Sequence, residues 1–231
     1  MQCIVVEIKI LYEDNHLLSV VKPPNIPVQQ DKSGDMDLLN LLKADIKARY
    51  NKPGNVFLGL VHRLDRPVGG VMVFARTSKA ASRLSAQIRE HKMGKTYLCV
   101  VKGCPDELAG QLTDFLLKDT KTNTVKVVPP GTRGAKQAVL EYEVLEYING
   151  LSLVKVNLLT GRSHQIRVQM ANNGTPLFGD SKYGHITEGR ENLALWSYEL
   201  SVEHPTKKER MSFSSPPPDI YPWNLFSMVK D

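Results

Sequence analysis

The densest group of reactive side chains in the sequence is His62-Arg63-Leu64-Asp65-Arg66-Pro67. It lies between an apolar approach and the short apolar run 71–75, which we expect to be a buried strand. Asp65 is a carboxylate flanked by two guanidinium groups, and nearby positive charge favours the ionised form. Such a carboxylate suits a nucleophile or an anchored electrostatic partner. The same neighbours also fit a solvated ion pair in a loop.

Residues 160–170 form a second polar cluster that allows two structures. As a strand, the cluster alternates apolar and polar residues. As a helix, Ser163 would cap its start, Ile166 and Met170 would face the core, and residues 172–174 would end it. We favour the helix, because residues typical of helix ends stand on both sides of the cluster.

In that helix, His164 and Arg167 lie on one face. A helix N-terminus with Arg162 beside it attracts anions such as phosphate. His164 alone also fits a hydrogen-bonded structural histidine.

Tyr97 follows Lys95 and Thr96 and begins a predicted strand. Its ring could pack in the core with the hydroxyl at the rim. Alternatively, the ring could be a stacking platform for a nucleic-acid base.

Metal and nucleotide motifs are missing from the sequence. The three cysteines include no CxxC pair, the six histidines include no HxxxH pair, and no glycine-rich phosphate loop occurs. We therefore expect no metal catalysis, and no dinucleotide or P-loop chemistry.

The charge balance points toward a polyanion. Lys and Arg number 30 against 24 Asp and Glu, and the pI is about 9.1. This excess fits a nucleic-acid partner, although many unrelated proteins are mildly basic. No apolar run approaches the roughly 20 residues of a membrane span. We expect no membrane association and a cytoplasmic location.

Hydrophobic periodicity predicts the elements that position these residues. We expect helices over 36–49, after Thr77, and over the second cluster. Strands are expected at 4–12, 17–22, 71–75, 96–102, 112–117, 124–128, 137–148 and 152–159. The pattern predicts an α+β fold around one central mixed, mostly antiparallel β-sheet with flanking helices. The tail 214–224 is expected to be an extended surface strap.

Together the segments resemble the RluA family of RNA pseudouridine synthases. The resemblance rests on strings of the sequence that occur in the family's order. They are Leu17 to Pro24, His62-Arg63-Leu64-Asp65, Lys95-Thr96-Tyr97, Gly161 to Arg167, Leu177 to Gly184 and Leu195 to Pro205.

The resemblance implies isomerisation of uridine in structured rRNA or tRNA, without cofactor or metal. It implies that Asp65 is the essential aspartate, that Tyr97 stacks on the target base and that Arg167 pairs with Asp65. Arg63 would enter the gap left by the flipped base. We expect Asp65, Tyr97 and Arg167 to line a basic active-site cleft. The expected RNA-binding residues are Arg63, Arg66, Arg162, His164 and Lys182. Further cations that could contact RNA are Lys121, Lys126, Arg133 and Lys136.

Three departures from the family pattern concern local rigidity and substrate preference. Val68-Gly69-Gly70 replaces a hydroxyl-bearing Thr-Ser-Gly, Gln169 replaces a common histidine, and Trp196 stands where the family has another histidine. We expect one catalytic domain over 1–231, with no separate N-terminal RNA-binding domain and no obligatory protein partner. The alternative function is a non-catalytic RNA-binding protein on the same fold.

Overall fold

The computed structural model describes residues 7–184 and 192–229. The chain divides into two compact units. The first unit comprises residues 1–93 and 200–215, and the second comprises 94–199 and 216–231. Each unit is described by itself.

The first unit is built on antiparallel strands in which β2 pairs with both β1 and β4, and β3 pairs with β4. The bounds are β1 Ile10–Glu13, β2 Leu17–Lys22, β3 Gly59–Leu60 and β4 Gly69–Ala75. The residues of β4 are all buried, which agrees with their continuous apolar sequence. Strand β10, Leu195–Glu203, runs from the second unit into the first, where β11, Arg210–Ser214, pairs with it.

Two helices of the first unit begin at side-chain caps. Asp37 accepts a hydrogen bond from the backbone N–H of Asn40 at the start of α1, Leu38–Arg49. Thr77 does the same for Ala80 at the start of α2, Ser78–Arg89. These caps satisfy N–H groups that have no partner inside the helix.

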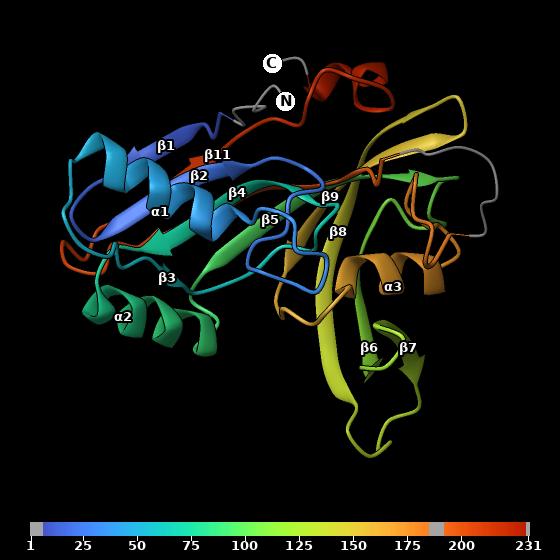
Figure 1. Cartoon of the computed structure of the whole chain (residues 1–231). Coiled ribbons are helices and arrows are strands. Elements are labelled where there is room, and N and C mark those ends of the chain that lie inside the picture. The colour runs from blue at the N-terminus through green and yellow to red at the C-terminus, as the bar shows by residue number, and fades with distance from the viewer. Residues whose placement is uncertain (1–6, 185–191, 230–231) are drawn as a thin grey trace. The chain divides into compact units, whose positions relative to one another are not determined.

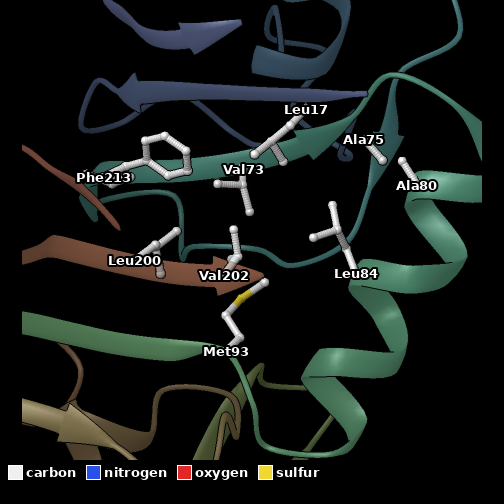
Figure 2. Packing of buried hydrophobic residues seen from close by; sticks show 10 residues of the cluster. Leu17, Val73, Ala75, Ala80, Leu84, Met93, Leu200, Val202 and Phe213 are labelled. Carbon is white, nitrogen blue, oxygen red and sulfur yellow. The ribbon is translucent and has the colours of Figure 1, made fainter. Parts of the chain in front are cut away.

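The core of the first unit joins α2 to the strands. Figure 2 shows Ala80 and Leu84 pointing from α2 toward side chains of the strands, among them Val73 and Val202. Leu84 and Val73 are completely buried. Burying a leucine side chain contributes about 1.5–3 kcal/mol. This packing holds β4, the strand that directly follows the Asp65 loop.

The second unit is built on antiparallel strands in the order β5-β9-β8-β6-β7. The bounds are β5 Gly94–Lys102, β6 Ala109–Asp119, β7 Thr124–Val128, β8 Lys136–Ile148 and β9 Leu151–Leu158. Asn149 and Gly150 connect β8 to β9 with positive φ angles of 53° and 78°, as a two-residue hairpin turn requires. Helix α3, Gln165–Asn172, packs against β6 and β7 (Figure 1).

The predicted α+β class is confirmed, as are most of the predicted elements. Part of the strand predicted at 4–12 lies outside the described residues, and β1 begins only at Ile10. The tail is more than a surface strap, because Trp223 in the short helix η1, Trp223–Leu225, and Phe226 after it are buried. Ser227, which begins η2, Ser227–Val229, hydrogen-bonds Glu146 of β8.

None of the described helices has the length and apolar character needed to cross a membrane. Within the same residues, no group of three or more His, Cys, Asp or Glu side chains is arranged to hold a metal ion.

Candidate active site

The Asp65 loop connects β3 to β4 in the first unit. The backbone N–H of Val68 donates to the carbonyl of Asp65 at 3.0 Å, which closes a turn around residues 66 and 67. His62 accepts a hydrogen bond from the N–H of Val73 at its Nε2 atom, also at 3.0 Å. His62 thus ties the start of the loop to β4, the Val68 bond closes the turn within the loop, and Asp65 is half-buried.

Lys22 is the main internal support of this loop. Its Nζ atom donates to the carbonyl oxygens of Pro23, Arg66 and Val68 at 3.0, 3.0 and 2.7 Å. These bonds use all three donors of an ammonium group. The Lys22 residue is fully buried. Burial lowers the pKa of Lys22 to about 7, while the charge of Asp65 acts in the opposite direction.

This role of Lys22 was not predicted from the sequence. The signal available was a lysine that ends the buried strand Leu17–Lys22 and directly precedes two prolines. Val68 is buried, and Gly69 and Gly70 belong to β4. The loop carbonyls are held by Lys22.

Arg63 and Arg66 differ in their surroundings, although both are exposed. Arg66 binds the carboxylate of Asp35, lies 3.8 Å from that of Asp31, and donates to the carbonyl of Asn25. Its charge is therefore offset by an acidic neighbouring segment. Among the described residues, Arg63 has no ion-pair partner.

The second cluster forms the predicted helix, and Asn172 to Gly174 end it as predicted. The predicted cap is wrong. The helix begins one residue after His164, which is the N-cap, has a left-handed φ of 52° and makes no side-chain cap bond. The Oε1 atom of Gln165 instead accepts from Thr160 and from the N–H of Arg162, so the side chain of Gln165 turns the chain before the helix.

Arg167 forms a buried, two-pronged ion pair with Asp180. Its Nε and Nη2 atoms donate to the two carboxylate oxygens at 2.8 and 2.6 Å. Burial acts to raise the pKa of Asp180, but Arg167 and the N–H groups of Lys182 and Tyr183 outweigh it and hold that pKa below its usual range. The Nη1 atom of Arg167 takes no part in this pair.

Tyr183 contacts both His164, at the start of α3, and Arg167 within it. Its hydroxyl lies 2.6 Å from Nδ1 of His164 and accepts from the N–H of Val125 at 2.9 Å. The guanidinium carbon of Arg167 lies 5.2 Å from the centre of its ring. His164 is buried in this contact, as expected for a structural histidine.

Asp180 and Tyr183 were not predicted as site residues, because their segment of the sequence has the composition of a turn.

Lys182 lies on the same turn, and its Nζ donates to the carbonyl of Asn123. Gln169 is fully buried on α3, and its amide donates to Asp114 of β6 at 2.8 Å.

Tyr97 lies on β5 opposite Val156 of β9 and is 7% exposed. Tyr97 and Arg167 belong to the second unit, whereas Asp65 belongs to the first. The contact of Asp65 with these two residues, and the basic cleft around them, stay predictions.

Replacing Asp180 by asparagine is expected to destabilise the protein by about 3–5 kcal/mol at neutral pH, because the buried Arg167 would lose the carboxylate that binds its Nε and Nη2 atoms. The lowered pKa means that the stabilisation is complete above the unfolded value of about 3.9 and is lost as pH falls through the folded value. Urea unfolding at neutral and acid pH measures both effects. The exposed pair of Asp45 and Arg49 is the control, and Asp45→Asn should cost at most about 1 kcal/mol. An equal loss in the two variants would contradict this expectation.

For Lys22→Met, the test is the pH dependence of stability. The folded pKa of about 7 lies below the unfolded value of about 10.4, so the unfolded chain binds more protons between these values and stability rises with pH there. Relative to Lys22→Met, the wild type should therefore gain as much as about 1.4 kcal/mol per pH unit in this window. Lys47→Met, at an exposed position of α1, should leave the profile of the wild type unchanged. Parallel profiles for the wild type and Lys22→Met would mean that Lys22 titrates normally.

Comparisons with known proteins point to one family. Residues 16–172 match the sequence profile of a family described as RNA pseudouridylate synthase. Ribosomal large subunit pseudouridine synthase D of Pseudomonas aeruginosa is 33% identical, over 98% of this chain and 73% of its own length. The protein of the same name from Zymomonas mobilis is 31% identical, over 92% and 70%.

Curated relatives are longer than this chain, which spans 66% to 73% of their length. The solved structure of human RNA Pseudouridylate Synthase Domain Containing 4 has the same fold, with a TM-score of 0.77 and 24% identity over 91% of this chain and 88% of that one. The profile match covers most of the chain and includes Asp65, Tyr97 and Arg167. The chain therefore belongs to the RNA pseudouridylate synthase family, whose members isomerise uridine in RNA.

Proposed function

We propose that this chain converts uridine to pseudouridine in ribosomal RNA and that Asp65 is the group that starts the reaction. The observation that carries this proposal is the Asp65 loop itself, a half-buried carboxylate on a turn whose carbonyls are bound by Lys22. A loop held in this way presents its carboxylate in one orientation. Such preorganisation is what a positioned nucleophile or base requires.

The reaction is an isomerisation, so no atom is gained or lost. The bond from N1 of uracil to C1′ breaks, the base rotates, C5 bonds to C1′, and the proton on C5 passes to N1 by way of a base or water. In one route Asp65 attacks C1′ as the bond to N1 breaks and leaves C1′ when C5 bonds to it. In the other route Asp65 takes the C2′ proton as the bond to N1 breaks and returns that proton to C2′ when C5 bonds to C1′. Both routes require an ionised carboxylate.

Arg167 and Tyr97 have supporting roles in this proposal. Arg167 keeps Asp65 ionised through the guanidinium edge that Asp180 does not occupy. Tyr97 stacks on the target base and is the nearest titratable candidate to receive the C5 proton.

Arg63 is assigned to base extrusion and not to the chemical step. A base inside a stem must leave its stack, at a cost of a few kcal/mol. The exposed Arg63 guanidinium is a planar cation suited to the vacated position. Arg66 contributes less to RNA attraction, because Asp31 and Asp35 already offset its charge.

Ribosomal RNA is the proposed substrate because the names of the two relatives described above refer to the ribosomal large subunit. We propose a cytoplasmic location and no obligatory protein partner. Mapping pseudouridine in cells with and without the gene identifies the RNA. If a pseudouridine is lost from tRNA while rRNA is unchanged, the substrate is tRNA and not rRNA.

Replacing Asp65 by asparagine should reduce turnover by at least about 100-fold while RNA binding and folding persist. The amide has nearly the same shape but is neither a nucleophile nor a base at neutral pH. The assay is single-turnover product formation on in vitro transcribed RNA. Asp45→Asn, the same change on the surface of α1, should behave as wild type. Near-normal rates for Asp65→Asn would refute both routes.

The effect of Arg63→Ala should depend on RNA structure. A stem-loop has stacking and pairing to break, whereas a short unpaired oligonucleotide has little. The single-turnover rate should therefore fall more on the stem-loop than on the oligonucleotide. Equal losses on both substrates would make Arg63 a general phosphate contact.

A further inference from the structure

A basic pocket of about 250 Å³ lies in the second unit, beside the start of α3. Its walls come from β6, β7, β8 and the loops before β8 and α3. The lining residues are Leu116, Lys118, Val125, Gly134, Lys136, Gly161, Arg162 and Ser163. We call it the hairpin pocket. Three of the lining residues are cations and none is acidic.

Strand pairing places the two lysines on one face of the sheet. Leu116 lies opposite Lys136 of β8, and Lys118 follows Leu116 by two residues on β6. Residues two apart on a strand share a face, as do residues directly opposite one another. The Lys118 and Lys136 side chains are therefore diagonal neighbours, with about 7–8 Å between their backbone positions.

Arg162 completes the charge of the pocket from the loop before α3. Its Nε atom donates to the carbonyl of Gln137 at 2.8 Å, which fixes the guanidinium beside Lys136. In the part of the chain that the structure describes, Arg162, Lys118 and Lys136 form no ion pair with a carboxylate. Three cations are thus brought together without a counter-charge, and an anion placed among them would offset their repulsion.

The floor of the hairpin pocket is rigid. Leu116 and Val125 belong to a buried apolar cluster with Val168 of α3. The N–H of Val125 donates to the Tyr183 hydroxyl, and the ring of Tyr183 lies against Arg167. The floor is therefore connected through packed side chains to the helix that carries Arg167.

The pocket is small enough to suit a single group of a polymer better than a whole small molecule. Sites for whole small molecules measure roughly 300–1,000 Å³, and this pocket is smaller. A larger pocket in the first unit is a weaker candidate, because its lysines already pair with glutamates, Lys92 with Glu90 and Lys208 with Glu203.

We infer that the hairpin pocket binds a backbone phosphate of the substrate RNA, next to the nucleotide that reacts. This inference rests on the proposed function, because it takes RNA as the ligand. The phosphate is neutralised by Lys118, Lys136 and Arg162. The packed contacts through Tyr183 hold the bound phosphate at a fixed position relative to α3. Binding there places the RNA strand relative to Arg167.

Salt dependence tests the inference, because each phosphate contact releases counterions. The affinity of one RNA stem-loop is measured from about 50 to about 300 mM salt for the wild type, Lys118→Gln, Lys136→Gln and the double variant. Because the pocket holds one phosphate, the double change should reduce the slope of log affinity against log salt by up to about 0.7–0.9, and each single change by a part of that. Lys47→Gln removes the same charge from α1 and should leave the slope unchanged.

Two further arms keep the result clear of folding effects. Lys118→Arg and Lys136→Arg retain the charge and should restore the wild-type slope. In the wild-type protein, NMR should show shifts of the Gly134 and Gly161 backbone amides as RNA is added. Wild-type slopes in the double variant, or amides that do not move, would overturn the inference.

Titration with inorganic phosphate distinguishes the two possible ligands, an RNA backbone phosphate and free phosphate. Saturable phosphate binding that the double variant loses, with an unchanged RNA slope, would assign the pocket to free phosphate and overturn the RNA subsite. Product formation is measured in parallel on the same RNA. Absence of pseudouridine with altered slopes rejects the proposed function alone, whereas normal product with unaltered slopes rejects the pocket alone.

Discussion

The buried pair of Arg167 and Asp180 sets the arrangement of the polar residues in the second unit. Two charges removed from water are costly unless each donor and acceptor is matched. Here both oxygens of Asp180 receive a guanidinium N–H, and one of them also accepts from backbone N–H groups. The match fixes α3 against the turn at residues 180–183. It also fixes the Arg167 guanidinium, whose orientation the proposed chemistry requires.

The Asp65 loop is stabilised in a different way, by a buried cation without a bound carboxylate. When Lys22 is buried, its ammonium group loses its hydrogen bonds to water. Hydrogen bonds to three carbonyl oxygens of the segments that it joins replace them. The cost of burial is visible in its lowered pKa. In both units the group proposed to act on RNA is thus positioned by a buried polar residue that does not itself react.

Patterns in the sequence predicted the regular elements well, because each follows from periodicity and end signals. Helix α1 lies within the predicted range 36–49, and its start is set by the Asp37 cap. The start of α3 was missed because His164 takes a left-handed conformation, which is uncommon for residues other than glycine and is not signalled by the neighbouring sequence. Lys22 and Asp180 were missed for a related reason. Their roles depend on contacts across 46 and 13 residues of chain, which local pattern does not contain.

The central claim is that Asp65 is held ionised by Arg167 at a single active site. A crystal structure of the wild-type protein tests it most directly, through the separation of the Asp65 carboxylate from the Arg167 guanidinium. The account predicts a direct ion pair within about 4 Å, or a contact through one water molecule. A larger separation, with Arg167 bound to Asp180 alone, would contradict the account.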